Sequence, residues 1–134
     1  MKRLLLLSTM ILLGACRPAT PTITGKEWVV VAIGDRIAPV GAGGKLLTLT
    51  LDDSTHHAYG FAGCNQYNAN YTLTDSALTF GPVMSTKMAC LESMEIEMVF
   101  LSTLPYVTNW QQPDSILTLT SSGGVAVKLR LGQH

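Results

Sequence analysis

Alternating apolar and polar positions dominate the chain from residue 25 onward. In the clearest case, Leu47, Leu49 and Leu51 alternate with two threonines. An alternation of period two predicts a half-buried β-strand. Similar short runs, separated by glycine, proline and aspartate, predict about eight strands in all. The runs cover residues 26–33, 45–51, 56–62, 67–74, 77–80, 106–110, 115–120 and 125–131.

One segment, residues 92–104, has the period of a helix instead. Its apolar residues recur at offsets of 0, 3, 4 and 8, which places them on one face. Pro105 should end this helix, because its ring is incompatible with a helix interior. The preceding residues 81–89 are expected to form a loop, since Gly81 and Pro82 interrupt the strand pattern. The apolar face consists of Ile96, Val99, Phe100 and Leu104.

These elements predict a mainly β fold. The connections are too short for parallel crossovers, except around the one helix, so the strands should be antiparallel. We expect a small antiparallel meander curled into a barrel of about eight strands, with one α-helix covering an opening. Closing the sheet in this way also removes exposed strand edges. Trp28 and Trp110 should lie at least partly in the core.

The first sixteen residues predict where the protein resides. Lys2 and Arg3 precede an apolar stretch, residues 4–13, which is shorter than the ~20 residues that span a bilayer. The following Leu13-Gly14-Ala15-Cys16 resembles a bacterial lipobox, whose cysteine is lipidated, with chains such as palmitate, and becomes the first residue after cleavage. The alternative is an ordinary secretory signal with an incidental cysteine.

This interpretation divides the chain into three parts. Residues 1–15 are a signal peptide of the lipoprotein type, 16–24 a proline-containing tether, and 25–134 a single domain. Cleavage removes two of the nine basic residues, so seven remain against nine acidic ones, a net charge near −2. No basic patch appears, which argues against nucleic-acid binding. We expect a monomer whose only membrane contact is the lipid on Cys16.

Two further cysteines, Cys64 and Cys90, remain in the exported part of the chain. An even pair in an oxidising compartment predicts a disulfide, and two buried free thiols are the alternative. A metal site is not predicted, because His56 and His57 are adjacent on a strand and point to opposite faces. They are expected to be solvated edge residues.

Motifs for other chemistry are incomplete. Residues 41–45 superficially resemble a phosphate-binding loop, but Pro39 stands where its first glycine is needed. Leu46 stands where a serine or threonine should bind magnesium, so a flexible connector is the better interpretation. No nucleophile elbow, zinc-binding helix or catalytic carboxylate pair can be placed. The sequence therefore predicts neither a cofactor nor an enzymatic activity.

Two irregular stretches each adjoin a cysteine. They are Gly63-Cys64-Asn65-Gln66-Tyr67 and Ser85-Thr86-Lys87-Met88-Ala89-Cys90. Together with the Tyr71 strand and the 92–104 helix, they resemble the META domain family, which includes heat-shock lipoproteins of the HslJ type. Lys87 stands where arginine is more common in that family, and it keeps the positive charge.

The resemblance implies a small barrel-like fold with one helix and, in some members, a lipid anchor and a link to envelope stress. It implies no reaction. Asn65, Thr86 and Lys87 have two interpretations: they satisfy backbone groups in a pinned loop, or they form a polar recognition loop. Four methionines near the helix could form an adaptable surface, but core filling is the expectation that we adopt. They are Met84, Met88, Met94 and Met98.

The function expected from these observations is that of a non-enzymatic envelope protein. It would act in stress tolerance or envelope maintenance by binding protein or a small apolar ligand. Arg17 follows the lipidated cysteine, and by analogy with enterobacterial sorting this points to the periplasmic face of the outer membrane. The alternatives are an inhibitor of a secreted enzyme and a hydrolase with an unrecognised site.

Overall fold

The structure is a computed structural model that describes residues 22–133, and within that range it contains ten strands and one α-helix. The expected signal peptide and Cys16 lie outside the described residues. The strands are β1 (Glu27–Ile33), β2 (Arg36–Ile37), β3 (Thr48–Asp52), β4 (His57–Phe61), β5 (Gln66–Leu73), β6 (Leu78–Phe80), β7 (Met84–Ser85), β8 (Asn109–Gln111), β9 (Ile116–Ser121) and β10 (Gly124–Leu131). The helix is α1 (Met94–Thr103), and two short 3₁₀ turns are η1 (Ala42–Gly44) and η2 (Leu104–Tyr106).

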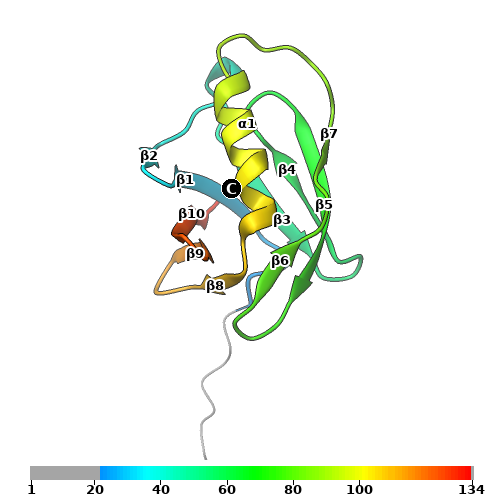
Figure 1. The fold of residues 1–134 in the computed structure, drawn as a ribbon, viewed down its shortest axis with the longest axis vertical. Helices are drawn as coiled ribbons and strands as arrows, with labels where there is room; N and C mark the ends of the chain where they lie inside the picture. The colour runs from blue at the N-terminus through cyan, green and yellow to red at the C-terminus, as the bar shows by residue number, and fades with distance from the viewer. Residues whose placement is uncertain (1–21, 134) are drawn as a thin grey trace, which may run out of the picture.

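The strands form one antiparallel sheet that curls into a nearly closed barrel (Figure 1). Their order is β6-β5-β4-β3-β1-β10-β9-β8, while β2 pairs with β1 and β7 with β5. The two ends of this order meet at a bridge between Ala77 and Asn109. Backbone hydrogen bonds from Leu78 to Thr108 and from Trp110 to Ser76 complete the contact. The mainly β fold with one helix is therefore confirmed.

The core lies inside this curled sheet, as the alternation predicted. The leucines of the β3 segment are fully buried, because they occupy its inner face. Both tryptophans are buried, and each indole N–H reaches a backbone carbonyl: Trp28 donates to Ile23 at 2.9 Å and Trp110 to Thr74 at 2.9 Å. Burial of a tryptophan is favourable when its N–H finds such a partner.

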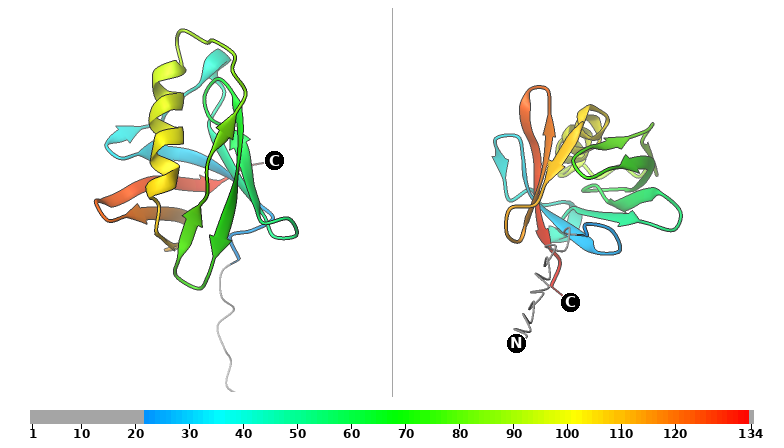
Figure 2. Two further views of the ribbon diagram at one scale, coloured as in Figure 1. Left: turned by 45° about the vertical axis from the view of Figure 1, so that its right-hand side comes forward. Right: turned by 90° about the horizontal axis from the view of Figure 1, so that it is seen from below.

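Helix α1 lies between the β5–β7 part of the sheet and the β8–β10 part (Figure 2). It directs the fully buried Phe100 into the core, where the ring meets Tyr67 edge-to-face at 5.5 Å between centroids. The α-helical part is shorter than predicted at both ends, and Pro105 lies in the following turn η2. A proline cannot continue the α-helical hydrogen bonds, so the change of helix type follows from its position.

Three expectations from the sequence need correction. Residues 81–89 are not all loop, because β7 lies within them and pairs with β5. The strand expected at 106–110 starts only at Asn109, since Tyr106 belongs to η2. Ile23, which we placed in the tether, is buried in the core and accepts the Trp28 hydrogen bond, so the domain begins earlier than residue 25.

Two glycines permit close approaches that shape the sheet. A Cβ on Gly60 would lie 2.2 Å from the carbonyl oxygen of Thr48, so β4 contacts β3 more closely than any side chain would allow. Gly41 meets the backbone of Gly63 in the same way, and Ala42 donates a hydrogen bond to the Gly63 carbonyl. The stretch expected to be a flexible connector is therefore packed against the Cys64 turn.

Candidate functional site

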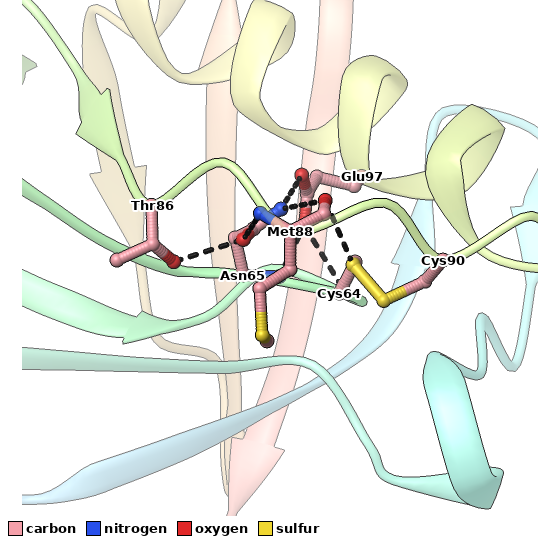
Figure 3. Close-up of a disulfide and its surroundings, with 6 residues drawn as sticks. All are labelled: Cys64, Asn65, Thr86, Met88, Cys90 and Glu97. Atoms are coloured by element: carbon pink, nitrogen blue, oxygen red, sulfur yellow. Dashed lines mark hydrogen bonds between the residues drawn. A yellow bond between two sulfur atoms is a disulfide. The ribbon is translucent and has the colours of Figure 1, made fainter.

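The buried carboxylate of Glu97, on α1, accepts hydrogen bonds from the turn after β4 (Figure 3). One of its oxygens accepts the backbone N–H groups of Cys64, at 2.8 Å, and of Asn65. The other accepts the side-chain amide of Asn65 at 2.7 Å. Glu97 is 8% exposed, and this arrangement satisfies its buried charge with three donors. The bonds fix α1 to the turn that follows β4.

Asn65 extends the network toward the segment after β7. Its side-chain oxygen accepts the Thr86 hydroxyl at 2.9 Å and the Met88 backbone N–H at 2.7 Å. Its side-chain nitrogen also donates to the Met88 carbonyl at 3.1 Å. All of its side-chain hydrogen-bonding groups are therefore used inside the protein, and the residue is 2% exposed.

Cys64 and Cys90 lie on either side of this network, joined as a disulfide with 5.7 Å between their Cα atoms. The link connects the turn after β4 to the segment just before α1. The Met88 carbonyl oxygen lies 3.3 Å from the Cys64 sulfur (Figure 3), a close contact only, because a disulfide sulfur has no hydrogen to donate. The disulfide joins the turn after β4 to the 86–93 connection, and the hydrogen bonds join the same turn to this connection and to α1.

The three residues expected to form a recognition loop separate in the structure. The side chains of Asn65 and Thr86 are hydrogen-bonded to each other, and Asn65 also bonds to the backbone of Met88. Lys87 is exposed, and its side chain lines a groove beside α1 instead. Lys87 is thus the charged member of the set that is exposed to a partner.

This groove, which we call the α1 groove, has a volume of about 580 Å³. It lies between the segment that contains β7 and the side of α1 that carries Met94, Met98 and the buried Glu97. A stripe at helical spacing, Met94, Met98 and Leu101, supplies its apolar wall. The complete lining is Ser85, Lys87, Met94, Glu95, Glu97, Met98 and Leu101.

The methionines do not fill the core, and our expectation on this point is wrong. Their exposed fractions are 64% for Met84, 61% for Met88, 46% for Met94 and 64% for Met98. Leu91, between them in sequence, is 94% exposed. The core positions of α1 are instead taken by Phe100 and, after it, Leu104. Residues 84–98 therefore present several large, flexible apolar side chains to solvent.

A second groove, of about 630 Å³, crosses the outer face of β1, β3, β4 and β10. Tyr59 and Phe61 contribute aromatic surface, and the Lys45 ammonium lies 6.0 Å from the Phe61 ring centroid. Glu27 and Arg130 add one charge of each sign. The mixed lining contrasts with the methionine-rich α1 groove.

The shifted ionisable groups have structural causes. Burial raises the pKa of Tyr67, whose hydroxyl donates to the Thr48 carbonyl at 2.9 Å. Burial, followed by the charges of Asp53 and Asp52, raises the pKa of Tyr71, which donates to the Asp52 carbonyl. Hydrogen bonds from Ser54 and Thr55 lower the pKa of the Asp52 carboxyl at its turn. Each group is thereby held in its ordinary charge state.

Among residues 22–133, no three of the histidine, cysteine, aspartate and glutamate side chains gather as metal ligands. His56 and His57 are both exposed, and the His56 ring meets Tyr71 edge-to-face at 6.0 Å. No helix in the described range is long and apolar enough to cross a membrane.

The family model of the META domain matches residues 21–132, nearly the whole described range. The chain belongs to the META domain family. The matched residues include both cysteine motifs and the Glu97 hydrogen bonds that join them. No curated protein matches the chain.

Two solved structures have the META chain's fold. An NMR structure of a protein from Burkholderia xenovorans is 27% identical, with a TM-score of 0.66, and the match covers 96% of this chain and 100% of that one. A second NMR structure is 15% identical, with a TM-score of 0.63 over 81% of this chain and 91% of that one. The second likeness concerns the fold alone.

Sequence reasoning missed the role of Glu97. It placed the buried face of this helix from the apolar residues alone. Of the glutamates on α1, Glu95 is a surface charge paired with Arg36, whereas Glu97 is buried. A signal was present, because Glu97 directly follows the core-facing Ile96 and precedes Phe100 by three residues. An acidic residue on that side of a helix requires a buried partner.

Proposed function

We propose that this META protein is a lipid-anchored, non-enzymatic protein of the bacterial envelope that binds apolar segments of other proteins. In this role it would support stress tolerance or envelope maintenance. The observation that carries the proposal is the exposure of Met94 and Met98, which line the α1 groove. Met84 and Met88, in the preceding segment, are exposed as well. Exposed apolar side chains in a soluble domain are costly to maintain in water and often mark binding sites.

Methionine suits a partner that is not fixed in shape. Its unbranched, polarisable side chain adapts to irregular apolar surfaces, so one site can accept many sequences. The scaffold beneath is rigid, because the Glu97 hydrogen bonds and the disulfide link fix the segments on both sides of the groove. A rigid base with adaptable side chains favours binding of partly unfolded proteins over recognition of one ligand.

The binding role can be tested with reduced α-lactalbumin, a client that exposes apolar segments and aggregates. The protein should suppress the light scattering of this client. The double substitution Met94→Gln with Met98→Gln should weaken the suppression, because it removes the apolar wall while keeping side-chain size. Val125→Thr, which changes an exposed apolar residue on β10, is the matched control. Equal suppression by both variants would contradict the proposal.

The membrane part of the proposal rests on the lipobox resemblance at Leu13-Gly14-Ala15-Cys16. Several acyl chains on Cys16 would give stable anchoring, since each buried CH₂ contributes roughly 0.8 kcal/mol. Cys16→Ser should therefore move the protein out of the detergent phase in a partitioning experiment, and unchanged retention would refute the anchor. Arg17 supports the outer membrane, which recovery in the inner-membrane fraction of a sucrose gradient would contradict.

A further inference from the structure

Strand β7 has one paired edge and one open edge. It pairs with β5 through Asn68↔Met84 and Tyr67↔Ser85. Thr86 donates its N–H to the Gln66 carbonyl at 3.1 Å, so Thr86 and Met84 are the residues whose backbone groups face β5. In an antiparallel strand these directions alternate. The N–H and C=O groups of Ser85, between them, must therefore point away from the sheet.

The pairing on the other side of β5 supports this assignment. Tyr71 donates to the His56 carbonyl, and Ala62 donates to the Asn65 carbonyl, so the odd-numbered residues of this segment bond with β4. Tyr67 accordingly uses its backbone groups toward β4 and leaves none for Ser85. Within residues 22–133, the backbone groups of Ser85 and Lys87 have no hydrogen-bond partner.

The open edge faces the α1 groove. Ser85 and Lys87 line it on one side, and the Met94, Met98 and Leu101 stripe lines it on the other. The chain passes from β7 over the 86–93 connection and returns along α1 in the opposite direction (Figure 1). Unpaired backbone groups at strand spacing therefore stand beside an apolar wall along the same groove.

We propose that an extended segment of a partner protein binds in the α1 groove by adding a strand to β7. This inference rests on the proposed function and names its binding mode. Only a polypeptide in extended form presents donors and acceptors that match those of Ser85 and Lys87. Its alternate side chains, on one face, would contact the methionine stripe and should be apolar.

Charge adds one element of selectivity. Glu95 is already paired with Arg36, and the Glu97 carboxylate accepts three hydrogen bonds, so the acidic groups lining the groove are engaged. Lys87 has no ion-pair partner within the described range. The segment that binds best should therefore carry an acidic residue at the end of its apolar run that lies beside Lys87, where its carboxylate meets the Lys87 ammonium.

The test uses a fluorescent peptide of alternating valine and threonine with an aspartate at each end, and its binding to the intact protein is measured by anisotropy. Two N-methylated forms are compared, each blocking every second amide. In the bound strand one set faces β7 and the other faces away. The first form should bind about tenfold more weakly and the second like the parent peptide. Equal effects of the two methylation patterns would overturn strand addition.

A variant gives a second measurement. Ser85→Pro removes the outward N–H and no hydrogen bond within the sheet, and proline is tolerated at an edge position of this kind. Peptide binding should fall about tenfold while the circular dichroism spectrum stays that of the parent. If the protein still suppresses client aggregation but both N-methylated peptides bind equally, strand addition is wrong and the proposed function stands. If neither the client nor the peptide binds, both are wrong.

Discussion

Glu97 accepts hydrogen bonds from both the backbone and the side-chain amide of Asn65, across a separation of 32 residues. One carboxylate thus holds the helix against the turn after β4, while Asn65 holds that turn against the segment after β7. The floor of the α1 groove depends on this pair. Substitutions of Glu97 or Asn65 should therefore lower the stability of the protein, and any loss of binding should follow from that lower stability.

Glu97→Gln should destabilise the protein by about 1–3 kcal/mol. A glutamine keeps the size of the side chain, but its NH₂ group would face N–H donors and leave at least one of them unsatisfied. Urea unfolding monitored by tryptophan fluorescence measures the change. Glu95→Gln is the control: it breaks an exposed ion pair with Arg36 and should cost about 0–1 kcal/mol. Equal costs for the two variants would contradict the assigned role of Glu97.

Reducing the Cys64–Cys90 link should lower the thermal midpoint without abolishing the β fold. A loop with a separation of 26 residues corresponds to about 3.5 kcal/mol of chain entropy in the unfolded state. The buried core should keep the fold in the absence of the bridge. Intact mass after alkylation without reductant tests the bond directly. Two alkylated thiols in the native exported protein would show that the bridge is absent.

Tyr67→Phe should destabilise the protein by about 1 kcal/mol at neutral pH, because it removes the hydrogen bond to the Thr48 carbonyl. The parent protein should also lose stability more steeply in alkali. Burial raises the Tyr67 pKa above its ordinary value of 10.0, so the unfolded chain releases this proton first. The neutral hydroxyl's contribution is full below pH 10.0 and is lost as the pH rises toward the folded pKa.

Urea titrations across the alkaline range check this prediction. The stability difference between the parent protein and Tyr67→Phe should shrink above the ordinary tyrosine pKa. A constant difference at every pH would show that Tyr67 titrates as it does in the unfolded chain.

Gly60→Ala should destabilise the protein by about 1–3 kcal/mol, since the added Cβ would meet the Thr48 carbonyl oxygen and separate β3 from β4. Gly123→Ala is the matched control, because its Cβ would meet nothing nearer than the Ser121 hydroxyl at 3.7 Å. Its effect should stay within about 0.5 kcal/mol. Thermal unfolding of the two variants measures the difference. Equal shifts of the melting temperature would contradict the close packing assigned to Gly60.

Much of the fold followed from local pattern. The leucines of β3 alternate with threonines, so one face had to be buried, and the helix period around Phe100 could not fit a strand. Short connections required antiparallel pairing. The two-residue strands β2 and β7 escaped prediction, because so short a segment has no detectable period and exists only through its partners β1 and β5.

The features of the candidate site also separate into those that the sequence predicts and those that depend on tertiary packing. The two paired cysteines, the lipobox-like Cys16 and the family motifs could be recognised from residue type and spacing alone. The exposure of Met94 and Met98, the burial of Glu97 and the open edge at Ser85 depend on which elements meet. A helical stripe is equally suited to a core or to a surface. Only the packing of α1, with Phe100 turned inward, decided which apolar face was left for a partner.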